Sequence, residues 1–187
     1  MIKELLLKNR SYRRFYQNER INTQVLNSLV ELTRYCASGR NAQTLKYLLI
    51  NEEEQCEKVF KTLAWAGYIS DWSGPEEGEK PSAYIIQIND DLLGKNFFSD
   101  DGITAQSILL GAVEMGFGGC ILRAFTKELN NIISTPENMS IVQVIALGKP
   151  KEEVVIDDMK EGDFKYWRDE KGVHHVPKRT LEELIIK

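Results

Sequence analysis

The chain has 187 residues, of which 42% are hydrophobic and 28% charged, and it carries a net charge of −4 at pH 7. This length and composition are typical of a folded globular protein with one domain and appendages rather than two full domains. The acidic balance disfavours general binding to nucleic acid or to an anionic membrane, because both need a basic surface.

Two helices are expected before residue 41. Ile2 and the leucines at positions 5–7 place an apolar stripe on a short helix that ends near Asn9. A second helix is expected from about Thr23 to Cys36, with Asn22 or Thr23 as its N-cap, and a polar stretch ends it. Its inward face is formed by five apolar residues: Val25, Leu26, Leu29, Val30 and Leu32.

Two buried strands are expected in the middle of the chain, over residues 45–50 and 83–88. A helix over residues 52–63 lies between them. The glycines, proline and acidic residues of 71–81 predict a mobile surface loop.

A longer helix is expected from about Asp101 to Met115, and Gly116 ends it as a C-cap. A short apolar piece over 120–122 follows. Thr126 is expected to cap a short helix over 127–133. The inward residues of the long helix are Ile103, Ile108, Leu109, Ala112 and Val113.

A third strand is expected over residues 141–147, and Gly148-Lys149-Pro150 stops it. Beyond Glu152 the chain has little core of its own. Residues 166–168 and 173–176 flank a turn and predict a hairpin or extended arm. The chain ends in an apolar patch that needs another surface, and a partner subunit is the expected one. This patch consists of Leu181, Leu184, Ile185 and Ile186.

The three cysteines, Cys36, Cys56 and Cys120, follow neither a C-x-x-C nor a zinc spacing. We expect reduced thiols in a cytosolic protein rather than a disulfide framework. The first ten residues carry too short an apolar run for a signal peptide, and no run reaches the roughly 18 apolar residues of a membrane span. A cytoplasmic protein is therefore expected.

Residues 10–14, Arg-Ser-Tyr-Arg-Arg, gather three guanidinium groups in an acidic chain. The sequence has no G-x-G-x-x-G fingerprint and no P-loop, so a phosphate-bearing ligand would have to be bound by another segment. Guanidinium forks and a serine hydroxyl match phosphate oxygens. The alternative is a solvated basic end of the first helix beside its C-terminal dipole.

Four segments, in this order, resemble the nitroreductase family. KNRSYRRF (8–15) resembles the R-S-x-R-x-F element at which family members hold the FMN phosphate, and SGRNAQ (38–43) is similar to the [PA]-S-x-x-N-x-Q element that reaches the flavin bound mainly by the other subunit. Residues 118–121, GGCI, resemble the loop beside the flavin ring. LGKPKE (147–152) resembles the G-x-P-x-E strand end that returns to the phosphate.

Two positions depart from the family pattern. Asn9 stands where many members have a first arginine, which leaves open whether Arg10, Arg13 or Arg14 makes the main phosphate contact. Ala37 stands where proline is common, a change that slightly loosens the loop but removes no polar contact.

The resemblance implies an α+β fold with a central, mostly antiparallel sheet flanked by helices. It implies an intertwined homodimer, with an FMN-binding core over 1–152 and an exchanged C-terminal arm over 153–187. The implied cofactor-binding residues are Arg10, Ser11, Tyr12, Arg13, Arg14, Ser38, Gly39, Arg40, Asn41, Gln43, Gly118, Gly119, Cys120, Lys149 and Lys151.

The implied function is an FMN-dependent oxidoreductase. NADH or NADPH would deliver a hydride to flavin N5 and leave, and a nitroaromatic, quinone or similar acceptor would then be reduced in the same place. No catalytic side chain is implied. A rival reading is a non-catalytic FMN-binding or redox-sensing protein on the same fold.

The remaining candidates are weaker. His174 and His175 alternate faces on the expected strand, so they do not easily ligate one metal together, and no metal is expected. Cys120 is more typical of a small buried thiol than of a nucleophile. Trp65, Tyr68 and Trp72 either line a substrate pocket or pack in the core.

Overall fold

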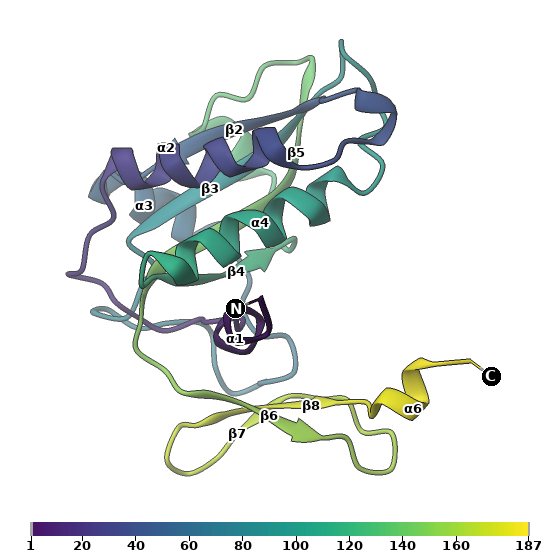
Figure 1. Cartoon of the computed structure of the whole chain (residues 1–187). Helices are drawn as coiled ribbons and strands as arrows, with labels where there is room; N and C mark the ends of the chain where they lie inside the picture. Colours follow the sequence, from purple (N-terminus) through teal and green to yellow (C-terminus); the bar gives the residue numbers. More distant parts are fainter. Residues whose placement is uncertain (1, 187) are drawn as a thin grey trace.

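The computed structural model describes residues 2–186 and contains two sheets (Figure 1). The larger is antiparallel throughout, with the strand order β1-β5-β3-β2 and with β4 also paired to β5. Its strands are β1 (Phe15–Tyr16), β2 (Leu45–Ile50), β3 (Ala83–Asp90), β4 (Gly118–Leu122) and β5 (Met139–Pro150). The expected α+β class and the antiparallel sheet are confirmed.

Helices cover both faces of this sheet, because alternate residues of β3 and β5 point to opposite sides. One core joins Tyr84 and Ile86 to α3 (Glu53–Phe60) and α5 (Glu128–Ile132). The other joins Ala83 and Ile85 to α2 (Thr23–Glu31) and α4 (Asp100–Glu114). Both faces of β3 are therefore mostly apolar, as the predominantly apolar stretch over 83–88 predicts.

One polar pair crosses the middle of the second core. Gln87 and Gln143 lie directly opposite each other on β3 and β5, and Gln143 Nε2 donates to Gln87 Oε1. Gln87 Nε2 donates to Thr104 Oγ1 at 2.8 Å, and Gln143 Nε2 also donates to the Asp101 carbonyl at 3.1 Å. Both amides are buried and bonded, which avoids the cost of unpaired polar groups.

Three expectations about helices need correction. The second helix ends at Glu31 and continues only as a 3-10 turn, η1 (Leu32–Tyr35); Asn22 is its cap, since its side chain accepts from Val25 N. Ile103 on α4 is 40% exposed and lies on the face turned away from the sheet. Thr126 makes no side-chain cap to α5, whose N-cap position is Lys127.

Two expectations about strands also need correction. The stretch 148–150 does not stop β5, because β4 pairs with Gly148 and β1 pairs with Lys149 and Pro150. Strand β2 has the expected bounds but only Ile50 is fully buried, since β2 lies at the edge of the sheet. Gly116 follows α4 with φ of 80°, which confirms its role beyond the helix end.

The remaining residues form a second, three-stranded sheet in the order β6-β8-β7. The predicted hairpin is present, since β7 and β8 pair antiparallel across the turn over 169–172. Helix α6 follows and begins with a complete capping box between Thr180 and Glu183. The elements are β6 (Val154–Asp158), β7 (Trp167–Arg168), β8 (His174–Lys178) and α6 (Leu181–Leu184).

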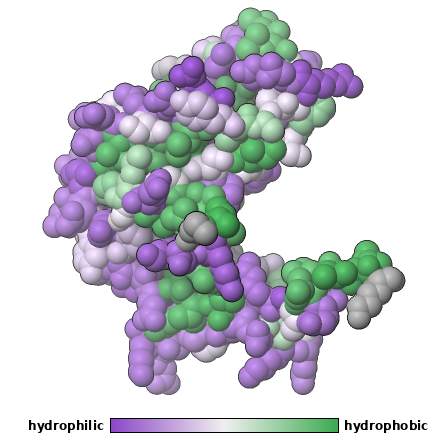
Figure 2. Space-filling view, in the orientation of Figure 1, coloured by the Kyte–Doolittle hydropathy of each residue, from purple (hydrophilic) through white to green (hydrophobic). Residues whose placement is uncertain are grey.

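Helix α6 points away from the body of the molecule (Figure 1). Figure 2 shows an open recess between the body and α6, with hydrophobic side chains on both sides of it. Leu181 and Leu184 are each 66% exposed, and α1 (Ile2–Lys8) exposes Ile2, Leu6 and Leu7. Among the residues described, no helix is long and apolar enough to span a membrane.

Candidate functional site

The fold brings three of the four motif segments together at the ends of α1 and α4. Ser11 bridges to Gly119, and Tyr12 N donates to the Gly119 carbonyl at 3.1 Å. Lys151 N donates to the Arg14 carbonyl at 3.0 Å. Residues 10–14 thus lie between β4 and the end of β5.

The two glycines of this site are needed for close packing. A Cβ on Gly118 would stand 2.6 Å from the Tyr12 ring, and one on Gly119 would collide with the Ala146 carbonyl. Cys120 is 2% exposed, and burial raises the pKa of its thiol to about 12. The burial of Cys120 in the core confirms the interpretation of this residue as a small buried thiol.

Two of the site's cations are already paired with one carboxylate. Arg14 binds Glu79 through two contacts, Nε to Oε2 at 2.5 Å and Nη2 to Oε1 at 2.7 Å. Lys151 Nζ lies 2.9 Å from Glu79 Oε1. Hydrogen bonds and charge from Arg14, and then from Lys151, hold the pKa of Glu79 at about 2 against the cost of burial. Both cations therefore have a structural partner.

Arg13 connects the motif to the C-terminal arm. Its backbone N–H donates to Glu152 Oε1, and its guanidinium lies 4.9 Å from the centroid of the Tyr166 ring. The Glu152 side chain is fully buried, and its other oxygen accepts from Arg168 Nη2 at 2.9 Å. Arg168 also stacks on Trp72 at 4.1 Å. One buried carboxylate thus holds both the motif and the arm.

Fewer hydrogen bonds and ion pairs are made by the side chains of Arg10, Ser11 and Lys149. Arg10 Nη2 donates to the Leu6 carbonyl at 2.6 Å at the end of α1, as the basic-helix-end reading predicts. Its Nε, however, is buried and has no hydrogen-bond partner among residues 2–186. Ser11 and Lys149 are exposed, and Lys149 makes no ion pair within the described chain. An unpaired guanidinium donor, a hydroxyl and an ammonium group on adjoining segments are groups that can bind a phosphate.

The fourth motif segment lies elsewhere. Ser38 and Gly39 bond to Asp100 at the start of α4, whereas Ser11 and Tyr12 contact Gly119 of β4, the strand that follows the end of α4. Helix α4 has 15 residues, so its two ends lie about 22 Å apart. In Figure 1 residues 38–43 are the blue turn at the upper right. This segment borders a cavity of about 480 Å³ that Ser38, Asn41 and Gln43 help to line.

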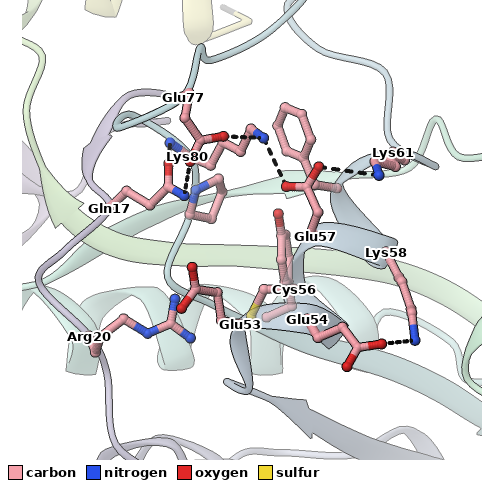
Figure 3. Close-up of a pocket in the computed structure, with 13 residues that line it drawn as sticks. Gln17, Arg20, Glu53, Glu54, Cys56, Glu57, Lys58, Lys61, Glu77 and Lys80 are labelled. Atoms are coloured by element: carbon pink, nitrogen blue, oxygen red, sulfur yellow. Dashed lines mark hydrogen bonds and ion pairs between the residues drawn. The ribbon is translucent and has the colours of Figure 1, made fainter.

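A second cavity, of about 590 Å³, contains none of the predicted site residues (Figure 3). It lies between α3 and the loop that carries Glu77 and Lys80. Lys80 Nζ contacts Glu57 and Glu77, each at 2.8 Å, so its charge is already neutralised. We therefore place the site at the motif segments rather than here.

Several site residues lay beyond sequence reasoning. Glu79 and Asp100 bind motif residues, but nothing in the local pattern singles them out. Among the residues described, no three His, Cys, Asp or Glu side chains gather to hold a metal ion. Trp65 is a core residue, whereas Tyr68 is 51% exposed and contacts Tyr166 of the arm.

Solved structures share this fold. A nitroreductase family protein from Clostridium novyi NT matches with a TM-score of 0.68 and 19% identity over 98% of each chain. An FMN-dependent nitroreductase from Clostridium difficile R20291 matches with a TM-score of 0.65 and 20% identity over 82% of this chain and 89% of that one. The α+β layers described above are therefore the nitroreductase fold.

A curated relative is similar in sequence. It is a protein of Archaeoglobus fulgidus named "Putative NADH dehydrogenase/NAD(P)H nitroreductase", 22% identical over 162 residues that span 82% of this chain and 86% of the relative. No protein-family model matches the chain. The chain therefore has the nitroreductase fold and is similar to a curated protein named as a putative NAD(P)H nitroreductase.

Proposed function

We propose that this protein is an FMN-dependent NAD(P)H oxidoreductase that reduces nitroaromatics, quinones or related small acceptors as a homodimer. The observation that carries the proposal is the separation of the motif segments by the length of α4. A single flavin cannot contact both segments of one chain. Two chains related by a twofold axis, with their α4 helices antiparallel, would bring the start of one α4 beside the end of the other.

Exposed apolar surface supports such a dimer. Helix α4 buries Ile108 and Leu109 against the sheet, yet it also carries Ile103 and the half-buried Leu110 on its outer face. A helix that is apolar on two sides is expected to be covered on both. The exposed apolar residues of α1 and α6 border the same recess and would be buried with it.

In this arrangement Arg10, Ser11 and Lys149 hold the phosphate, and Arg13 supports them from the arm side. Asn41 of the second subunit offers amide donors to the polar edge of the ring or to the ribityl chain. When bound, FMN supplies the redox chemistry, taking electrons from NADH or NADPH and passing them to the acceptor. Arg14 and Lys151 stabilise the arrangement of the site by pairing with Glu79.

Titration of the protein with FMN tests the cofactor assignment. We expect the variant with Arg10→Ala and Arg13→Ala to bind FMN at least 10-fold more weakly, because each charge-assisted phosphate contact contributes about 1.5–3 kcal/mol. Lys58→Ala is the control, since Lys58 is nearly half exposed, pairs with Glu54 and lies at the cavity of about 590 Å³, which contains none of the predicted site residues. Unchanged FMN affinity in the double variant would show the phosphate assignment to be wrong.

Anaerobic mixing of the FMN-loaded protein with NADH or NADPH tests turnover. Rapid loss of the oxidised flavin absorbance, restored by a quinone or nitroaromatic, is the expected result. A protein that binds FMN tightly but is not reduced by either nucleotide would instead be the non-catalytic flavin-binding protein considered above.

A further inference from the structure

Residues 38–43 have a backbone that their side chains do not favour. Arg40, Asn41 and Gln43 have φ of 54°, 55° and 48°. Residues other than glycine rarely adopt this left-handed region, and three of them within four positions persist only where neighbouring groups hold them. The contacts that hold this segment therefore decide where Asn41 lies.

Asp100, the first residue of α4, supplies the main contacts. Its side chain is buried, its Oδ2 accepts from the Ser38 hydroxyl at 2.6 Å, and its Oδ1 accepts from Gly39 N at 2.8 Å. Ser38 Oγ in turn accepts from Gln43 N at 3.0 Å. A single carboxylate thus fixes the beginning of the segment directly and its far end through one hydroxyl.

The same contacts orient the Asn41 side chain. Gln43 Nε2 donates to Asn41 Oδ1 at 3.1 Å and to the Asn41 carbonyl at 3.3 Å. With its oxygen engaged, the Asn41 amide keeps both N–H donors, and these have no partner within residues 2–186. Asn41 is exposed and lines the cavity of about 480 Å³. The donors are thereby available to a ligand.

We propose that Asp100 is a positioning residue for the cofactor site: through Ser38 and Gln43 it holds Asn41 so that its N–H donors face the flavin bound by a second subunit. This inference rests on the proposed function. The neighbouring acid, Asp101, lacks this role, because its carboxylate pairs with Arg123 on the other side of the helix start. The two adjacent acids therefore have separable tasks.

Asp100→Asn is the informative change. Two donors, the Ser38 hydroxyl and the Gly39 N–H, face the two carboxylate oxygens, whereas a carboxamide offers one oxygen and one NH2 group. One orientation of the amide sets its NH2 group against the Gly39 N–H. The other makes the Ser38 hydroxyl accept from the NH2 group and leaves the hydroxyl proton without its acceptor. Asp101→Asn is the matched control, since it also removes a buried negative charge from the first turn of α4 but leaves the segment's contacts intact.

Amide hydrogen exchange of the FMN-free protein gives the first readout. In Asp100→Asn the amides of Gly39 and Gln43 are expected to exchange about 10-fold or more faster than in the wild type, while Asp101→Asn leaves them unchanged. Equal protection of both amides in the two variants would overturn the inference, whatever the flavin affinity.

A double-mutant cycle on FMN affinity gives the second readout. Asp100→Asn and Asn41→Ala are each expected to raise the FMN dissociation constant about 10-fold, and the combined variant to be no weaker than either alone. Multiplying effects would mean that Asp100 acts only through general stability, and would overturn the inference. A wild-type protein that binds no FMN would overturn the proposed function itself, whereas full FMN binding by Asp100→Asn would overturn this inference alone.

Discussion

Replacing Arg168 by alanine removes the cation that links the arm to the buried carboxylate of Glu152. The Arg168 side chain is 13% exposed and that of Glu152 is fully buried, so water cannot replace the lost partner. Breaking a buried pair from one side costs about 3–5 kcal/mol, and loss of the stack on Trp72 adds about 1 kcal/mol. The N–H groups of Arg13 and Arg14 still donate to Glu152, so we expect about 3–4 kcal/mol in total.

Urea denaturation of the FMN-free protein, at one fixed protomer concentration, measures this loss as a change in the free energy of unfolding. Arg179→Ala is the control on the same arm. Arg179 and Glu183 lie 3.5 Å apart and are both nearly half exposed, so its loss is expected to cost about 0–1 kcal/mol. Arg168→Lys keeps the charge but not the planar stack, and its effect is expected to lie between the two.

A destabilisation by Arg168→Ala below about 1 kcal/mol, equal to that of the control, would refute the argument. It would mean that Glu152 is satisfied by the backbone alone and that the arm is fastened by its aromatic contacts. A coupling between Arg168→Ala and Glu152→Gln close to zero would lead to the same conclusion.

Three further outcomes are expected. Burial and the charge of Arg13 lower the pKa of His174 to about 4 from 6.5. The stability that depends on a neutral His174 is therefore complete above pH 6.5 and is lost as the pH falls toward 4, a loss on the order of 3 kcal/mol. The dependence of the melting temperature on pH should be weaker in His174→Gln. Leu110→Lys on the outer face of α4 should yield monomers by sedimentation, whereas an unchanged dimer would exclude the α4 interface. Asn41→Asp should lower the flavin midpoint potential in spectroelectrochemistry with little change in FMN-free melting, and an unchanged potential would leave Asn41 a turn residue.

Much of the fold can be read from local patterns. The strands over 45–50 and 83–88 are short, mostly apolar stretches, and the N-terminal helix and Gly116 follow simple periodicity and capping rules. Helical periodicity wrongly predicts that Ile103 faces inward. An apolar residue that faces away from the core of its own chain looks the same in sequence as one that faces the core. Strand β1 has only two residues and is defined by its pairing with β5, so no local pattern indicates it.

Only part of the candidate site could be predicted from the sequence, for a similar reason. The basic segment over 10–14 and the SGRNAQ segment stand out in composition and in resemblance. Their structural partners do not, because Glu79 lies 65 positions from Arg14 and Asp100 lies 62 positions from Ser38. A carboxylate that is paired across such a distance resembles any surface acid until the fold brings the two together.

The glutamine pair between β3 and β5 has a consequence for how the sheet finds its alignment. Where one face of a sheet is apolar and the other polar, sliding a strand by one residue exposes the core, so hydrophobicity alone enforces the alignment. Here both faces of β3 are mostly apolar, and a strand shifted by one residue would still bury apolar side chains. Gln87 and Gln143 would then lose their hydrogen bond and leave unpaired amides in the core, a cost in free energy that only the native alignment avoids. Replacing both with leucine should keep the protein compact while hydrogen exchange along β5 reveals more than one alignment. A single alignment would show that the turns, together with the shift of register between β3 and β5 at Gln87 and Ile88, suffice.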